Sequence, residues 1–258
     1  MGELVFFKSD EKLLYKSFIY FPIPKCGSNV FYHSLRGLDF NVEKDKLGGI
    51  IFKKNLRKTP SGKAKDQINY LIELYEPDFI LESFKFTFVR HPLDRFLSAY
   101  LSMSSNFGNP DISFLGSYLN DKWDGKEDLW VTGRGGLSID EKIYRFNKFC
   151  SLFVFPCADL HFSNYFFNLP KDLNQLDFVG KLESADNDFK FTVNKILCGR
   201  EKDVEDAFKI YKDTIVIHSD HDSRHKRKNL NYREFYSDEN YKLVASNFKK
   251  EMDMFDYE

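Results

Sequence analysis

The chain has 258 residues, a length typical of one large domain or two small ones. Hydrophobic residues make up 42% of it and charged residues 30%, which is typical of a soluble globular protein and excludes a disordered chain. The 38 Lys and Arg residues and 39 Asp and Glu residues give a net charge of −1, so no overall field attracts nucleic acid. Any site for a polyanion must therefore be a local concentration of positive charge.

The sequence lacks the features that mark secreted and membrane-bound chains. Its four cysteines are widely scattered without a Cys-x-x-Cys pair, which indicates neither a zinc site nor a disulfide framework. The first residues have no basic region followed by an apolar region, as a signal peptide would. No apolar run approaches the roughly 18 residues of a membrane span. We expect a cytoplasmic protein with no membrane span.

Five short apolar runs predict buried strands, because each is rich in Phe, Val or Ile and is bounded by Pro, Gly, His or charged residues. Continuous rather than alternating apolarity is typical of strands covered on both faces, as in parallel sheets. In chain order the predicted strands are Ser17–Phe21, Lys85–Val89, Leu152–Phe155, Asp177–Gly180 and Thr214–Ile217.

Helical patterns lie between these strands and after them. Strands that alternate with helices predict the α/β class, with a central, mainly parallel sheet flanked by helices. The stretch from Ser104 to Gly136, rich in Gly, Asn, Asp and Ser, indicates an excursion from the sheet, so we expect a single domain over residues 1–258. The predicted helices are Ser28–Leu35, Lys65–Tyr75, Pro92–Leu101, Ile139–Phe149, Asn187–Leu197 and Asp238–Met252.

The segment Pro24-Lys-Cys-Gly-Ser-Asn29 connects the first predicted strand to a helix. A helix amino terminus presents free backbone N–H groups and a dipole that favours an anion. Gly27 allows close approach of a phosphate, Lys25 adds a charge, and Ser28 and Asn29 add side-chain donors. The loop lacks the GxxxxGK[ST] pattern of a Walker A motif. Phosphate binding and an ordinary strand–helix turn both remain open for this segment taken alone.

A second candidate begins where the second predicted strand ends, at Arg90. Open α/β sheets bind ligands at the carboxyl ends of their strands, and a guanidinium can hold a phosphate through two hydrogen bonds. On the helix that follows, Ser98 shares a face with Asp94 and with Arg95. The alternative is that these helix residues are merely solvated.

Taken together, the two segments resemble sulfotransferases, which use 3′-phosphoadenosine-5′-phosphosulfate (PAPS) as donor of the sulfuryl group. Residues 24–29 resemble their 5′-phosphosulfate loop, and Arg90-His-Pro-Leu-Asp-Arg-Phe-Leu-Ser-Ala-Tyr100 resembles their 3′-phosphate motif, R-x-P-x-x-R-x-x-S-x-Y. His161-Phe-Ser-Asn164 with Leu176-Asp-Phe-Val-Gly-Lys-Leu-Glu183, and the segment from His225 to Tyr257, resemble the carbohydrate branch, which includes the chondroitin enzymes. Phe162 stands where that branch usually has Trp. The chain resembles a compact bacterial relative without the membrane anchor of the Golgi enzymes.

The resemblance implies a P-loop-like sulfotransferase fold, PAPS as donor, 3′-phosphoadenosine-5′-phosphate (PAP) as product, and a hydroxyl acceptor, most simply on a carbohydrate. It implies no metal. Lys25 and His161 are the implied catalytic residues, with Glu183 as an alternative base. The residues implied in binding the donor are Lys25, Cys26, Gly27, Ser28, Asn29, Arg90, Ser98, Arg227, Lys228 and Asn229.

Other functions remain possible at this point. A nucleotide-dependent kinase that uses the same phosphate loop is a second interpretation, although the Walker A pattern and an evident magnesium-binding carboxylate after a strand are both missing. A non-catalytic nucleotide- or glycan-binding module derived from a sulfotransferase is a third interpretation. His218, His221 and His225 have the spacing of metal ligands on a helix, but the Ser and Asp residues among them and the predicted strand before them favour a loop.

Overall fold

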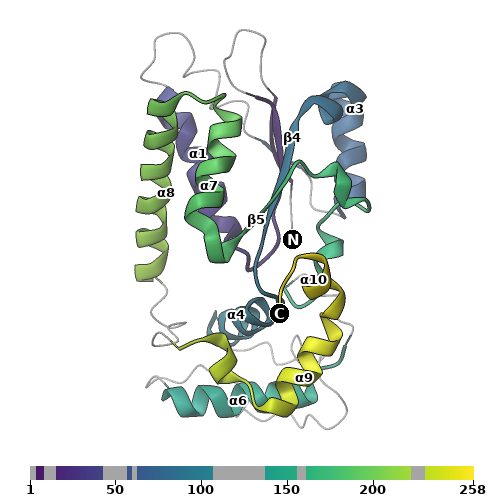
Figure 1. Ribbon diagram of the computed structural model, residues 1–258, viewed down its shortest axis with the longest axis vertical. Helices are drawn as coiled ribbons and strands as arrows, with labels where there is room; N and C mark the ends of the chain where they lie inside the picture. Colours follow the sequence, from purple (N-terminus) through teal and green to yellow (C-terminus); the bar gives the residue numbers. More distant parts are fainter. Residues whose placement is uncertain are drawn as a thin grey trace. The chain divides into compact units, whose positions relative to one another are not determined.

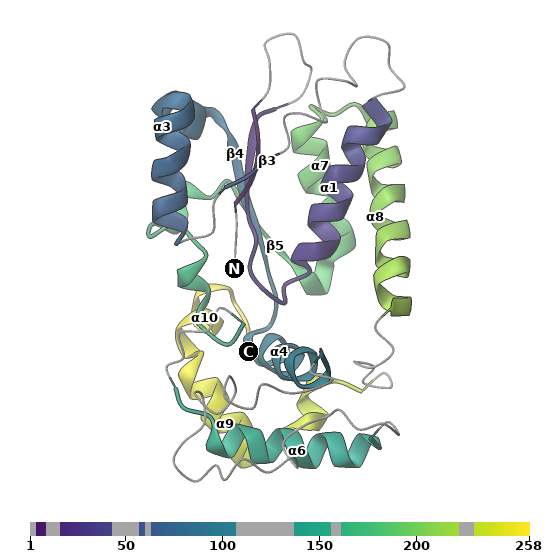
Figure 2. The same cartoon turned by 180° about the vertical axis from the view of Figure 1, so that it is seen from behind.

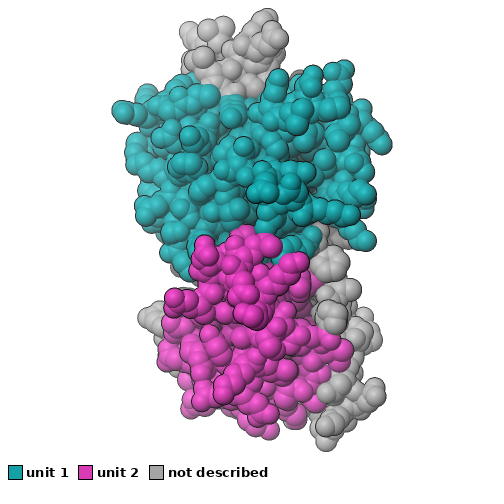
Figure 3. Space-filling view, turned by 45° about the vertical axis from the view of Figure 1, so that its right-hand side comes forward, with its two compact units in different colours: residues 1–90, 165–221 teal, residues 91–164, 222–258 magenta. Residues whose placement is uncertain are grey.

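The computed structural model of the chain describes residues 4–8, 16–42, 57–59, 63–106, 137–155, 161–221 and 230–258. Two compact units divide it (Figure 3): residues 1–90 with 165–221 form unit 1, and residues 91–164 with 222–258 form unit 2. The expectation of a single domain remains a prediction. Among the described helices, none has both the length and the apolarity needed to cross a membrane.

Unit 1 is built on a five-stranded sheet with the strand order β3-β1-β2-β4-β5 (Figures 1 and 2). The central strand β2 pairs in parallel with β4, and β4 pairs in parallel with β5, while β1 is antiparallel to both of its neighbours. Three of the predicted strands are therefore confirmed, and the sheet has the predicted parallel centre. The bounds are β1 Val5–Phe7, β2 Phe18–Phe21, β3 Arg57–Lys58, β4 Phe84–Val89 and β5 Phe178–Lys181.

Helices cover both faces of this sheet, as the continuous apolarity of its strands predicts. In both views α1, α7 and α8 lie on one face and α3 on the other (Figures 1 and 2). Phe7 packs in the core under the first group, whereas its neighbour Phe6 contacts Tyr75 and Phe79 of α3, because side chains alternate along a strand. The predicted α/β fold is confirmed. The bounds are α1 Ser28–Val42, α3 Ala64–Glu82, α7 Ala185–Ile196 and α8 Glu201–His221.

A stack of aromatic rings joins α1 to the centre of the sheet. Phe31, in the first turn of α1, lies face to face with Phe88 of β4, with ring centroids 3.7 Å apart. On β5, a Cβ atom at Gly180 would lie 2.5 Å and 2.7 Å from two carbons of the Phe88 ring. Glycine at position 180 therefore gives Phe88 the space from which it contacts Phe31.

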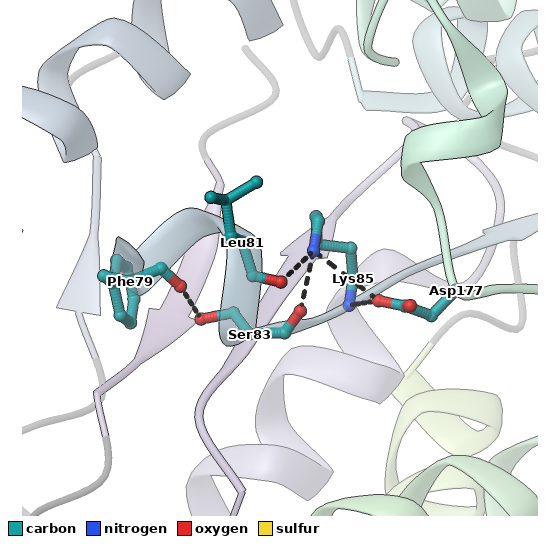
Figure 4. A network of polar contacts seen from close by, with 5 residues as sticks. All are labelled: Phe79, Leu81, Ser83, Lys85 and Asp177. Atoms are coloured by element: carbon teal, nitrogen blue, oxygen red, sulfur yellow. Dashed lines mark hydrogen bonds and ion pairs between the residues drawn. The ribbon is translucent and has the colours of Figure 1, made fainter. Parts of the chain in front are cut away.

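A polar network fixes the start of β5 (Figure 4). The backbone N–H of Lys85 donates to Asp177 Oδ2 at 2.7 Å, and the N–H of Asp177 donates to the Lys85 carbonyl at 2.7 Å. The Lys85 ammonium lies 3.7 Å from the same carboxylate and donates to the carbonyls of Ser83 and Leu81, at the end of α3. One lysine thus joins α3, β4 and β5 and sets the register of the last strand.

The strand predicted at Thr214–Ile217 is wrong, because these residues belong to α8. Val204, Ala207 and Tyr211 are buried at helical spacing against the core of unit 1, and Ile215 continues that stripe. Amphipathic packing over a long helix outweighs the local β-propensity of four residues.

The strand predicted at Leu152–Phe155 is also wrong, because Leu152 is the last residue of α6 (Ile139–Leu152). A capping box of Ser138 and Glu141 starts this helix, and Phe149 and Phe153 continue its buried stripe. The short strand β1 escaped prediction, since three residues carry too little periodicity.

Unit 2 is helical and has its own aromatic core. Phe96 of α4 (Pro92–Asn106) lies among Phe149, Phe153, Phe162 and Phe248. The predicted carboxyl-terminal helix is two helices, α9 (Asp238–Asn247) and α10 (Lys249–Met254). The α6 side chain of Asn147 fixes the start of α9: it donates to the Phe235 carbonyl at 2.7 Å and accepts from the Ser237 N–H at 2.8 Å.

Replacement of Gly180 by alanine is expected to destabilise the protein by roughly 1–3 kcal/mol, because the new methyl group overlaps the Phe88 ring on a strand that the ladder holds in place. Denaturant unfolding measures this loss. Phe88→Leu makes room for the methyl group, so it should cost less stability in the Gly180→Ala background than in the wild type. Additive losses in the two backgrounds would show that the overlap is relieved elsewhere.

Candidate functional site

The loop between β2 and α1 has two residues in the left-handed backbone region. Lys25 has φ +67° and Gly27 has φ +73°. Glycine adopts this region freely, but lysine does so at a cost, and such strain is concentrated at functional sites. The N–H of Cys26 donates to the Ile23 carbonyl at 3.1 Å, which closes the turn. The helix then starts with the Phe31 N–H donating to the Gly27 carbonyl at 3.0 Å.

Gly27 also allows close packing beneath the loop. A Cβ atom at this position would lie 3.0 Å from both Leu182 Cδ1 and the Phe31 ring. Leu182 begins the short 3-10 helix η4 (Leu182–Ser184), which directly follows β5. The loop is therefore supported from below by two elements of the same unit, while Asn29 is exposed and Ser28 is partly exposed.

Arg90 and Lys25 meet at the carboxyl ends of two neighbouring parallel strands. Arg90 directly follows β4 and donates from Nη1 to the Lys25 carbonyl at 3.3 Å. Burial of the Lys25 ammonium, and secondarily the charge of Arg90, lower the pKa of Lys25 from 10.5 to about 8. Two cationic side chains thus lie together beside the amino terminus of α1. An anion bound there would stabilise both charges.

Two tyrosines that the sequence analysis did not single out lie behind this site. The Tyr165 side chain is completely buried, and its hydroxyl donates to the Arg90 carbonyl. The Tyr20 hydroxyl is also buried and has no hydrogen-bond partner among the described residues. Burial, and secondarily the thiol of Cys26, raise the pKa of Tyr20. Cys26 itself is fully buried, so its side chain fills the core behind the loop.

Ser98 and His161 belong to unit 2. On α4 the partly exposed residues Asp94 and Ser98 share a face, as predicted, whereas Arg95 is completely buried. The Arg95 guanidinium donates to the Ser163 carbonyl at 2.7 Å, next to the buried Phe162. The backbone after His161 is thereby fixed, and His161 is partly exposed. Arg95 is therefore a structural residue and not the solvated surface residue of the alternative interpretation.

The remaining predicted site residues belong to the segment from His218 to Asn229. Arg227, Lys228, Asn229 and His225 lie outside the described residues. His218 and His221 are on α8, which ends at His221, and not in the expected loop. In the described part of the chain, no cluster of three or more His, Cys, Asp or Glu residues has the arrangement of a metal site.

A comparison with protein families matches residues 15–258 to the sulfotransferase family. The chain belongs to the sulfotransferase family. Searches of curated proteins and of solved structures found no match. The fold and the motif order agree with this sulfotransferase assignment, and sulfuryl transfer is the reaction of the family.

The buried charge of Lys25 in this sulfotransferase should lower its stability. Lys25→Met is expected to raise the Tm by roughly 2–6 °C at pH 7. At this pH Lys25 is charged in both states, and only the folded state buries the charge, so the variant is relieved of that cost. Above pH 8 the folded wild type loses the proton while the unfolded chain keeps it up to about pH 10.5. Wild-type stability therefore rises relative to the variant between pH 8 and 10.5, so the difference in Tm should be clearly smaller at pH 9.5 than at pH 7.

Thermal melts at pH 7 and pH 9.5 measure this effect. Lys202→Met, at an exposed position near the start of α8, is the matched control and should show no such change with pH. A Lys25→Met variant less stable than wild type at pH 7 would contradict the expected cost of burial.

Proposed function

We propose that the protein transfers a sulfuryl group from PAPS to a hydroxyl of a carbohydrate or related acceptor. The observation that carries the donor assignment is the pairing of Arg90 with Lys25 at the amino terminus of α1. A half-buried ammonium next to a guanidinium is unfavourable unless an anion binds between or beside them. A donor that carries a phosphosulfate and a 3′-phosphate offers anionic groups for both cations.

The proposed roles follow the motifs. Lys25 stabilises the bridging oxygen on which negative charge develops as PAP leaves. The backbone of Cys26–Asn29 binds the 5′-phosphate at the start of α1. Arg90 and Ser98 bind the 3′-phosphate, and the residues Arg227, Lys228 and Asn229 close over the nucleotide. For Ser98 and the last three residues the assignment rests on the resemblance of their sequence segments.

The chemistry is an in-line displacement at sulfur. The acceptor oxygen forms a bond to sulfur as the bond between sulfur and the bridging phosphate oxygen breaks, and PAP leaves with the electron pair. The acceptor hydroxyl gives its proton to a base. The protein contributes positioning and neutralisation of charge, much as enzymes do in phosphoryl transfer.

Two residues are candidates for the base. His161 matches the histidine of the family motif, and the ordinary pKa of histidine suits proton transfer near neutral pH. Glu183 is exposed and directly follows Leu182, which packs beneath the Gly27 loop. We propose His161 as the base and keep Glu183 as the alternative.

The donor assignment predicts selective binding of PAP. Thermal melts should show stabilisation by PAP but not by ATP with magnesium, which a kinase would bind. In calorimetry Arg90→Ala should weaken PAP binding by about ten- to a hundredfold, since it removes a charge-assisted contact to the 3′-phosphate. Adenosine 5′-monophosphate lacks that phosphate and is the matched ligand control. Equal losses for both ligands would place Arg90 away from the 3′-phosphate.

The catalytic assignment predicts turnover of labelled PAPS with a carbohydrate acceptor, found by a screen of glycans and small alcohols. His161→Ala should lower kcat by roughly a hundredfold or more and remove the acidic limb of the pH–rate profile. Glu183→Gln should keep both, and melts check that each variant is folded. The reverse pattern would identify Glu183 as the base. Binding of PAP without turnover on any acceptor would favour a non-catalytic module.

A further inference from the structure

The Tyr165 hydroxyl lies at one end of a chain of two hydrogen bonds that runs to the phosphate loop. Tyr165 is the first residue of the short helix η2 (Tyr165–Phe167), and its hydroxyl donates to the Arg90 carbonyl. Arg90 in turn donates from its guanidinium to the Lys25 carbonyl at 3.3 Å. All three residues belong to unit 1.

The position of Arg90 explains why this support is needed. The parallel ladder between β4 and β5 ends at the pair of Val89 and Lys181, so Arg90 lies one residue beyond the last paired residue of β4. Its carbonyl receives the Tyr165 hydroxyl at the point where the ladder stops holding the backbone. A long arginine side chain can be aimed accurately only if its backbone is fixed.

Lys25 depends on Arg90 in the same way. Its backbone has φ +67°, a conformation that a residue with a Cβ atom keeps only when its surroundings hold it. The hydrogen bond from Arg90 to its carbonyl is one such restraint. Movement of Arg90 would therefore change both the guanidinium and the ammonium of the proposed donor site.

We propose that Tyr165 is a positioning residue of the donor site, which fixes the Arg90 backbone and thereby holds the guanidinium of Arg90 against Lys25. Tyr165 does not touch the donor. The role in donor binding rests on the proposed function, whereas the effect on Arg90 and Lys25 is a property of the ligand-free protein.

The first experiment tests this effect without any ligand. Tyr165→Phe removes the hydroxyl and keeps the buried ring. Because the nearby charge of Arg90 contributes to the lowered pKa of Lys25, its release should move that pKa from about 8 towards 10.5. ¹³C NMR titration of the lysine side chains measures the shift, with the Lys25 signal assigned by its loss in Lys25→Arg.

Tyr20→Phe is the matched control. It removes a second buried hydroxyl from the same unit, one with no hydrogen-bond partner among the described residues, so the Lys25 titration should stay as in the wild type. An unchanged Lys25 titration in Tyr165→Phe would overturn the proposal, whether or not the protein binds PAP.

The second experiment is a double-mutant cycle in PAP affinity. Tyr165→Phe alone should weaken PAP binding by roughly three- to tenfold. In the Arg90→Ala background the same change should have less than about a twofold effect, because the side chain through which Tyr165 acts is gone. Additive losses would mean that Tyr165 supports the fold generally and would overturn the positioning role. A wild type that fails to bind PAP, with Lys25 still shifted in Tyr165→Phe, would reject the proposed donor and keep the positioning of Arg90.

Discussion

The face-to-face contact between Phe31 and Phe88, with ring centroids 3.7 Å apart, is the interaction on which the proposed donor site depends. Phe31 lies in the first turn of α1, immediately after the phosphate loop, and Phe88 lies two residues before Arg90. One stacked pair therefore fixes both the amino terminus that would bind an anion and the strand end that carries the guanidinium. The missing side chain of Gly180 leaves the space that Phe88 occupies. Phenylalanine suits this position because two flat rings can stack between the start of α1 and β4.

Against this rigid support, the loop itself concentrates unfavourable features. Lys25 combines a left-handed backbone with a half-buried charge next to a second cation. Such features persist only where their surroundings hold them, and here the turn hydrogen bond of Cys26 and the guanidinium of Arg90 do so. A site built in this way is organised before its ligand arrives, which reduces the rearrangement that must accompany binding and reaction. In a chain with a net charge of −1, these two cations are the local concentration of positive charge that the proposed polyanionic donor requires.

The sequence was informative where a local pattern and the tertiary environment agree. Strands β2, β4 and β5, the loop with Lys25, and Arg90 at a strand end are all recognisable from short segments. The strand prediction for Thr214–Ile217 is wrong because the segment lies in the long helix α8, where Ile215 continues a buried stripe that begins at Val204 and that a short window does not capture. Tyr165 could not be found in this way. It contacts a residue 75 positions earlier in the chain, and a single Tyr within an aromatic run carries no signal of that contact.

The segment from Asp177 to Glu183 contributes three contacts to the fold around the loop that carries Lys25. Asp177 fixes the register of β5 through Lys85, Gly180 makes room for Phe88, and Leu182 packs beneath Gly27. Leu182 lies against the loop itself, Gly180 acts through Phe88 of β4, and Asp177 acts at the start of β5. The three residues are spaced along β5 and the turn after it, so each contacts a different residue: Lys85 and Phe88 in β4, and Gly27 in the loop. Glu183 follows Leu182 and, like Asp177, is exposed. Its carboxylate is the alternative to His161 as the base of the proposed reaction.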